Sequence, residues 1–283
     1  MTAKIREMNP TRCKVPPSAT GATLLDFVAD SVQVSRRKAK ALLDARVVFV
    51  NNHRVWMARK CLRLGDIVEI HQESSAPHAH RLRLLYQDDD LVVADKPAGL
   101  LATGRNSLEI LLRKQLKRPG LVAVHRLDKE TTGCLILATD ADVKAQMVTI
   151  FQAGEVTKVY RAIVQGRFSS VEGTLNGAID GKRARTRYRV MDPGELASHV
   201  RIHIETGRTH QIRKHVAEAG HPIVGDRFYA TKKIPRYELR AVPRQMLHAE
   251  SIRFPQPATN EVVQAGSRLP CDFTTCLHRL HLH

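Results

Sequence analysis

At 283 residues the chain is long enough for one large domain, or for a medium one and a small one, each with its own core. Its 45 Lys and Arg residues against 28 Asp and Glu residues give a formal charge of +17, which indicates a polyanionic partner, with nucleic acid favoured over a membrane surface. The sequence has no charged-then-apolar leader and no apolar run long enough to span a bilayer, and five scattered cysteines without a CxxC pair argue against a disulfide framework. We therefore expect a protein of a reducing cytoplasm.

The N-terminal part of the chain is predicted to hold an arm, a small folded unit and a linker. Residues 1–20 are polar and end in KVPPSATG, which predicts a flexible arm. Residues 21–71 predict two helices (ATLLDFVADSV and SRRKAKALLDA), a strand pair around an Asn-Asn turn (VVFVNNHRV) and a last strand (LRLGDIVEI). Residues 72–81, QESSAPHAHR, have the composition of a linker.

The second of these helices carries a cationic face. Arg36 and Lys40 are four residues apart and therefore lie together on the helix, next to Arg37. This helix and the strands after it resemble the small RNA-binding domain named for a small-subunit ribosomal protein, which precedes the catalytic part of many RNA-modifying enzymes. The resemblance implies that Arg36, Arg37 and Lys40 contact RNA. The alternative is an ordinary solvated helix face.

From residue 82 onward the pattern predicts one domain of mixed structure. Strand-like runs such as LVVADK, CLILAT and KVYRAIVQG alternate with helical runs such as SLEILLRKQLK, ADVKAQMVTIFQAG and RTHQIRKHVAEAG. The mixture indicates an α+β or α/β domain, and its length fits a single domain over residues 82–283.

Motifs for metals and nucleotide cofactors are missing from the sequence. His210 and His215 are five residues apart, unlike the four-residue spacing of HExxH, and neither GxGxxG nor GxxxxGK[ST] occurs. We interpret these histidines and His125 as hydrogen-bonded scaffold with no catalytic part. The tail CLHRLHLH is interpreted as a frayed end or a weak metal site. No metal and no cofactor are expected.

Three glycine-anchored polar turns are the candidates for chemistry. They are DKPAGLLATG (95–104), VHRLDKETTG (124–133) and the longer stretch ETGRTHQIRKHVAEAGHPIVGDRFYA (205–230). Together they supply several cations and few spare carboxylates, with Asp128 among the cations. That combination suits an anionic substrate that is held by Arg and Lys and attacked by a single carboxylate.

These turns resemble, in order, the motifs of the RluA-type pseudouridine synthases. HRLDKETTGCLILA resembles the central motif, whose aspartate is catalytic, and DKPAGLL resembles the first motif. TKVYRAIVQG resembles the tyrosine-bearing strand, TGRTHQIRKH with GHPIVGDRFYA the third motif, and QMLHAESIRF the last. The matches span roughly residues 84–256. The resemblance implies an α+β catalytic domain with a central mixed, largely antiparallel sheet flanked by helices.

The resemblance also implies roles for single residues. Asp128 is expected to be the catalytic carboxylate, which attacks the sugar or the base or removes a sugar proton, and Arg213 its cationic partner. Tyr160 is expected to stack on the flipped uracil and to serve as the base in the last proton transfer. The residues expected to bind the substrate are Arg126, Leu247, Arg208 and Lys96.

The function implied is the isomerisation of specific uridines to pseudouridine in structured RNA, without a cofactor because the atoms are only rearranged. Ribosomal RNA, of the large subunit, is the favoured substrate and transfer RNA the second. The protein is expected to act as a cytoplasmic monomer without a membrane partner. Two other classes remain open: a non-catalytic RNA-binding or ribosome-assembly factor, and a glycoside or nucleoside hydrolase. The hydrolase would need paired carboxylates, and Glu130 is the only acid close to Asp128 in sequence.

Overall fold

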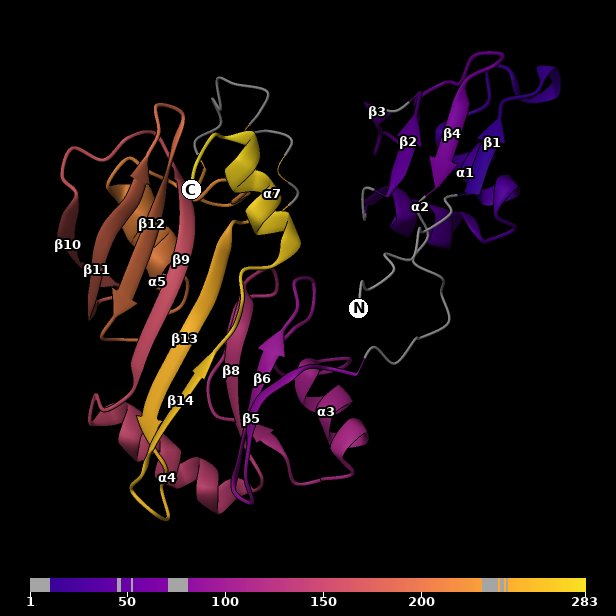
Figure 1. Ribbon diagram of the computed structural model, residues 1–283. Helices are drawn as coiled ribbons and strands as arrows, with labels where there is room; N and C mark the ends of the chain where they lie inside the picture. Colours follow the sequence, from indigo (N-terminus) through magenta and orange to yellow (C-terminus); the bar gives the residue numbers. More distant parts are fainter. Residues whose placement is uncertain are drawn as a thin grey trace, which may run out of the picture. The chain divides into compact units, whose positions relative to one another are not determined.

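The computed structural model divides the chain into two compact units, residues 1–80 and residues 81–283. It describes residues 11–44, 47–51, 53–70, 81–230, 239, 242 and 244–283, which are the coloured parts of Figure 1. Apart from Arg81, the predicted linker over residues 72–81 lies outside the described residues and stays a prediction. Each unit has its own buried core.

The N-terminal unit packs two helices against a four-stranded antiparallel sheet of order β1-β4-β2-β3. Its elements are β1 (Thr11–Lys14), the 3-10 helix η1 (Pro17–Ala19), α1 (Leu24–Ser31), α2 (Arg36–Asp44), β2 (Val48–Val50), β3 (His53–Arg54) and β4 (Ile67–Ile70). The predicted helix–helix–strand–strand order is confirmed. Asn51 has a φ of 52° between β2 and β3, a left-handed conformation that Asn tolerates in turns.

The prediction of a flexible arm over residues 1–20 is wrong for its second half. β1 is an edge strand paired with β4 along its length, and Val15 after it is buried in the core of the unit. Three of the four β1 side chains are exposed, so the segment shows too few apolar residues to be recognised as a strand. Residues 1–10 lie outside the described residues.

The C-terminal unit is built on a ten-stranded sheet, whose strands run β10-β11-β12-β9-β13-β8-β6-β5, with β14 paired to β13 and β7 to β8. Among the described strands only β13 and β8 pair in parallel. The predicted α+β class with a mixed, largely antiparallel sheet is therefore confirmed. The strands are β5 (Leu84–Gln87), β6 (Leu91–Lys96), β7 (Val122–Ala123), β8 (Thr132–Ala138), β9 (Thr157–Gln165), β10 (Glu172–Ile179), β11 (Lys182–Pro193), β12 (Ala197–Ile204), β13 (Leu247–Pro255) and β14 (Val262–Gly266).

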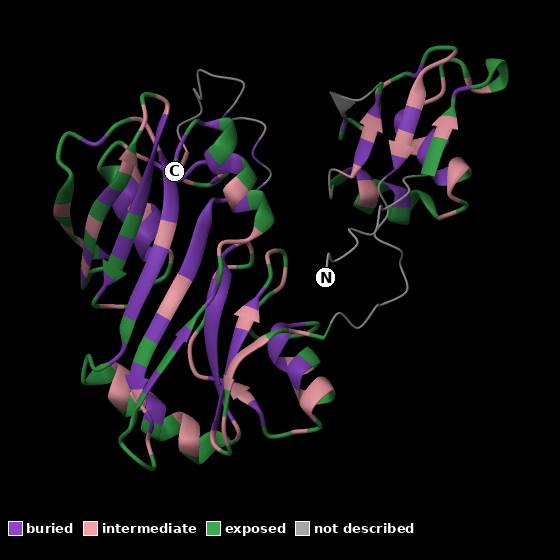
Figure 2. Ribbon diagram, viewed as in Figure 1, coloured by how far each residue is buried: buried purple, intermediate pink, exposed green. Residues whose placement is uncertain are grey.

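Helices flank this sheet, as Figure 1 shows: α3 (Leu108–Leu116), α4 (Ala141–Gln152), α5 (Gln211–Glu218) and α7 (Cys271–Arg279). The side chain of Ser107 caps α3 and that of Asp140 caps α4. β8 is buried at every position because core clusters cover both of its faces (Figure 2). This explains why its sequence, TGCLILA, shows a continuous apolar run after the glycine instead of alternation. None of the described helices is long and apolar enough to cross a membrane.

Two sequence-based expectations about helices are corrected. The run RTHQIRKHVAEAG does not form one helix, because His210 has a φ of 55° and α5 begins only at Gln211. The C-terminal tail is not frayed, because α7 packs Phe273 into the core and Leu282 is buried after it. The alternation in HRLHLH therefore reflects packing. Within the described residues, no group of three or more His, Cys, Asp or Glu is placed to hold a metal ion.

A candidate active-site cleft

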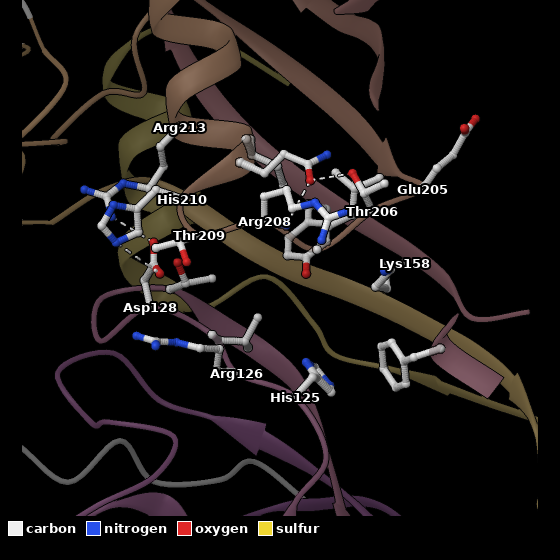
Figure 3. A pocket seen from close by; sticks show the side chains of 18 of the residues that line it. His125, Arg126, Asp128, Lys158, Glu205, Thr206, Arg208, Thr209, His210 and Arg213 are labelled. Carbon is white, nitrogen blue, oxygen red and sulfur yellow. Dashed lines mark hydrogen bonds and ion pairs between the residues drawn. The ribbon is translucent and has the colours of Figure 1, made fainter. Parts of the chain in front are cut away.

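A cleft of about 600 Å³ opens between the turn before β8, the strand β9, the end of β12 and the start of α5. Figure 3 shows its walls, with Asp128 and Arg213 on one side of the view and Lys158 on the other. Six of the residues singled out from the sequence line this cleft: Asp128, Tyr160, Arg213, Arg126, Leu247 and Arg208. They come from four separate stretches of the chain, which the fold brings together.

Asp128 lies on a tight turn between β7 and β8. Its carbonyl accepts a hydrogen bond from the N–H of Thr131 at 3.0 Å, and the neighbouring Leu127 is buried in the core. Behind the turn, Gly133 has a φ of +106°, and a Cβ there would lie 2.2 Å from the carbonyl oxygen of Ala249. Only glycine permits this approach of β8 to β13. The turn is thus anchored on both sides, and it presents a carboxylate that is 19% exposed to the cleft.

The carboxylate of Asp128 is paired with a buried guanidinium. Arg213 Nη1 donates to Asp128 Oδ2 at 2.8 Å, while its Nε and Nη2 donate to the two carboxylate oxygens of Asp226 at 2.6 and 3.0 Å. The Arg213 side chain is 5% exposed and that of Asp226 is 0% exposed. The rings of Phe228 and Tyr229 lie over the guanidinium, with centroids 5.7 and 5.0 Å from Cζ. Arg213 is therefore held on every side before any substrate binds.

The charged forms of Arg213 and Asp226 are stabilised by the hydrogen bonds between them. Burial alone would raise the pKa of Asp226, but hydrogen bonds from Arg213 and from the backbone N–H groups of Phe228 and Tyr229 lower it below its usual value. Burial alone would lower the pKa of Arg213, but bonds to Asp226 and Asp128 raise it. The sequence analysis missed Asp226, although a carboxylate inside the motif-like stretch GHPIVGDRFYA is a signal that was available.

Two further polar side chains, neither of them predicted as a catalytic or substrate-binding residue, lie next to Asp128. His210 Nε2 lies 3.6 Å from Asp128 Oδ1, and its Nδ1 is 2.9 Å from the Tyr229 hydroxyl. Burial lowers the pKa of His210, so the ring is mainly neutral at pH 7. The amide of Gln245 donates to Thr131 at 2.7 Å and lies 3.5 Å from Asp128 Oδ2. His210, which was predicted to be hydrogen-bonded scaffold, therefore lies next to the Asp128 carboxylate.

Tyr160 and Leu247 form the apolar side of the cleft. Both are buried, Tyr160 on β9 and Leu247 at the start of β13. Burial and the negative charge of Asp128 raise the pKa of Tyr160 well above its ordinary value. The neutral phenol is therefore the favoured form in the free protein, and the use of Tyr160 as a base stays a prediction. A neutral phenol can stack on a planar group or donate a hydrogen bond.

Arg126 and Arg208 are the exposed cations of the cleft. Arg208 Nε donates to the Arg183 carbonyl at 3.3 Å, and the described residues provide neither of the two guanidinium groups with an acidic partner. Glu205, the one acid besides Asp128 among the lining residues, pairs with Arg185 and Arg187. The mouth of the cleft therefore suits an anionic substrate.

Lys96 lies away from the cleft, contrary to the expectation that it binds substrate. It is completely buried, and its Nζ donates to the carbonyls of Pro97, Leu100 and Lys129 at 2.9, 2.7 and 2.9 Å. Burial lowers the pKa of Lys96 to about 7. Lys96, the last residue of β6, instead holds the turn after β6 against the turn that carries Asp128.

Replacing Lys96 by Met is expected to lower the free energy of unfolding by about 2–4 kcal/mol, because three carbonyls lose a charged donor. Urea unfolding followed by circular dichroism measures this. The matched control is Lys129→Met, since the Lys129 side chain is exposed and its carbonyl remains in place. Equal effects of the two substitutions would contradict the structural part given to Lys96.

The predicted RNA contacts Arg36, Arg37 and Lys40 belong to the N-terminal unit. All three are exposed on α2. Arg36 pairs with Asp26 at 3.0 Å and Lys40 pairs with Asp44, whereas the described residues include no acidic partner for Arg37. Exposed ion pairs of this kind are weak and exchange readily for phosphate contacts. The cationic face is thus present, and its contact with RNA stays a prediction.

Comparison with protein families matches residues 90–218, which include most of this cleft, to the model of the RNA pseudouridylate synthase family. The chain is 35% identical over 230 residues to ribosomal large subunit pseudouridine synthase D of Pseudomonas aeruginosa, covering 70% of this chain and 72% of that protein. It is 30% identical over 286 residues to the protein of the same name from Haemophilus ducreyi, covering 87% of this chain and 86% of that protein.

Solved structures give the same picture. Human RNA pseudouridylate synthase domain containing 4 superposes with a TM-score of 0.60 at 29% identity, over 71% of this chain and 93% of the human one. Human RNA pseudouridylate synthase domain containing 1 superposes with a TM-score of 0.60 at 26% identity, over 69% of this chain and 87% of the human one.

Proposed function

Because this chain belongs to the RNA pseudouridylate synthase family, in its RluA-type branch, and is thus an isomerase, we propose that it converts specific uridines of large-subunit ribosomal RNA to pseudouridine. The names of its relatives support the choice of ribosomal RNA. The charge of +17 and the row Arg183, Arg185, Arg187 and Arg189 on β11 support a polyanionic substrate. Transfer RNA is the second candidate. We further propose that the protein acts as a cytoplasmic monomer.

The observation that carries this proposal is the pairing of Asp128 with Arg213 inside the cleft, at 2.8 Å. A carboxylate that acts on a nucleotide must stay ionised when the nucleotide displaces water from it, and a fixed guanidinium supplies the counter-charge. Oδ2 accepts from Arg213, while Oδ1 lies 3.6 Å from a mainly neutral imidazole. In this proposal, Oδ1 is the oxygen left to act on the substrate, either by attack on the sugar or base or by removal of a sugar proton.

The remaining lining residues receive roles that match their chemistry. Tyr160 stacks on the flipped uracil and Leu247 forms the floor beneath it, since both are buried at the cleft. Arg126 and Arg208 contact the backbone phosphates at the mouth, where they are exposed. In the N-terminal unit, Arg36, Arg37 and Lys40 supply further sequence-independent contacts to the RNA.

The test is to incubate the protein with unmodified transcripts of its own organism's large-subunit ribosomal RNA and transfer RNA, and to map pseudouridine by chemical labelling and sequencing. We expect pseudouridine at one or a few positions of the ribosomal RNA and none in transfer RNA. Product only in transfer RNA would overturn the substrate assignment. Release of free uracil would support a hydrolase, and tight salt-sensitive binding without product would support a non-catalytic RNA-binding factor.

A further inference from the structure

The cleft holds a second buried cation, which the roles above do not use. Lys158 lies on β9, lines the cleft and is only 8% exposed. Among the described residues no carboxylate or carbonyl accepts a hydrogen bond from its ammonium group, and its one aromatic neighbour is Phe151, with Nζ 5.4 Å from the ring centroid. Lys96, which is also buried, donates to three carbonyls. Lys158 therefore lacks the partners that a structural lysine has.

An unpartnered buried ammonium is unfavourable in the free protein. Burial lowers the pKa of Lys158, and the cation–π contact with Phe151 replaces only part of the lost hydration. Buried charges are normally paired, and exceptions concentrate where a ligand supplies the missing charge. Because Lys158 lines a solvent-filled cleft, a ligand can reach it.

Lys158 lies next to Tyr160, the residue proposed to stack on the target uracil. Residues two apart on a strand point to the same face and lie about 6.5 Å apart, so Lys158 is beside Tyr160 on the cleft side of β9. Phe151, Gln152 and His125 line the same cleft, and we refer to these three residues as the lobe around Lys158. Burial, assisted by the charge of Lys158, lowers the pKa of His125 to about 3, so that ring is neutral. These three neighbours carry no acid, and Glu205, which Figure 3 shows on the same side of the view, is already paired with Arg185 and Arg187.

We propose that Lys158 and the lobe around it form a subsite for a phosphate group that flanks the target uridine. RNA carries such a group on each side of every nucleotide, and a lysine ammonium is a compact point charge suited to phosphate. The subsite is distinct from the exposed Arg126 and Arg208, which contact the backbone at the mouth of the cleft. The inference rests on the proposed function for the identity of the nucleotide, but the phosphate contact can be tested without catalysis.

The first test compares the binding of uridine, uridine 3′-monophosphate and uridine 5′-monophosphate by NMR titration of the full chain. The wild type is expected to bind one of the monophosphates about tenfold or more tightly than uridine, as one charge-assisted hydrogen bond provides. Lys158→Met should remove this preference and Lys158→Arg should keep part of it. The matched control is Lys114→Met, an exposed lysine on α3 that does not line the cleft.

The second test uses the RNA that the wild type modifies. Lys158→Met is expected to raise KM about tenfold with little change in kcat, and to reduce the slope of log Kd against log salt by about 0.7, the value for one phosphate contact on a single strand. Its free energy of unfolding should equal or exceed that of the wild type, because the substitution removes an unpartnered buried charge. A salt slope and a monophosphate preference that Lys158→Met leaves unchanged would overturn the subsite. A Lys158-dependent preference in a protein that makes no pseudouridine would instead overturn the proposed function and keep the subsite.

Discussion

Asp128→Asn is expected to reduce the single-turnover rate of pseudouridine formation by more than about a thousand-fold, the loss typical of removing a catalytic group. The amide keeps the size of the side chain but has one oxygen instead of two and no negative charge. It can neither attack carbon nor accept a proton at neutral pH. Its remaining oxygen can still accept from Arg213 Nη1, so the fold and the affinity for RNA should change little.

This expectation is checked by quench-flow assay on the target RNA, with RNA affinity and urea unfolding measured in parallel. The matched control is Asp89→Asn, an exposed carboxylate of the same unit that does not line the cleft. A variant that retains a tenth or more of the wild-type rate would show that Asp128 is a structural ion-pair partner and that another group performs the chemistry. If Asp128→Asn lowers both the stability and the rate, Asp128→Glu separates the structural role of Asp128 from the catalytic one. This variant keeps the negative charge but displaces the carboxylate. A stable Asp128→Glu variant with a low rate would support catalysis, whereas one with the wild-type rate would contradict it.

The residues that the sequence identified are those whose neighbours along the chain form a motif. Asp128 and Arg213 lie 85 positions apart, yet each sits in a recognisable stretch, and the resemblance joined them before the structure did. Lys158 lies two residues before Tyr160 in the stretch TKVYRAIVQG, but the sequence analysis gave a role to the tyrosine and none to the lysine. Its surroundings come from Phe151 of α4 and from β12 and β13, which pair with β9 on either side. Such a residue is recognised only after the fold has put its neighbours in place.

Lys96 shows the opposite failure, in which a motif pointed to the wrong role. The resemblance of DKPAGLL to the first motif placed Lys96 among the residues expected to bind the substrate. The structure instead turns the side chain inward, where it donates to three carbonyls of the two turns it bridges, and the Lys129 carbonyl also accepts from the N–H of Gly99 at 2.9 Å. Which side chain donates to a backbone carbonyl depends on the tertiary structure and cannot be predicted from the order of the residues alone.

The second large effect is expected at Asp226, which touches Arg213 but not the substrate. Asp226→Asn should lower the free energy of unfolding by about 3–5 kcal/mol, because it leaves a buried guanidinium with one charged partner in place of two. The guanidinium is then free to move toward Asp128 or out of its site. The rate of pseudouridine formation should fall with it, since the counter-charge of the catalytic carboxylate is no longer fixed.

The pH dependence of stability tests whether the effect of Asp226→Asn comes from the lost negative charge of Asp226. In the folded protein the pKa of Asp226 lies below the ordinary value of 3.8, so its stabilising contribution is complete above about pH 4 and is lost as pH falls through the folded-state pKa. The difference in unfolding free energy between the wild type and Asp226→Asn should therefore be constant near neutral pH and shrink in acid. A difference that stays constant down to about pH 2 would contradict an electrostatic origin.

Asp272 provides the comparison that isolates burial. It also holds an arginine bidentately, with Arg244 Nε and Nη2 donating at 2.6 and 2.8 Å, but its side chain is 42% exposed. Water can replace the lost carboxylate there, so Asp272→Asn should destabilise the fold by only about 1 kcal/mol. Because the two arginines are equally buried and the two carboxylates differ in exposure, the ratio of the two effects measures how much the burial of the carboxylate itself contributes.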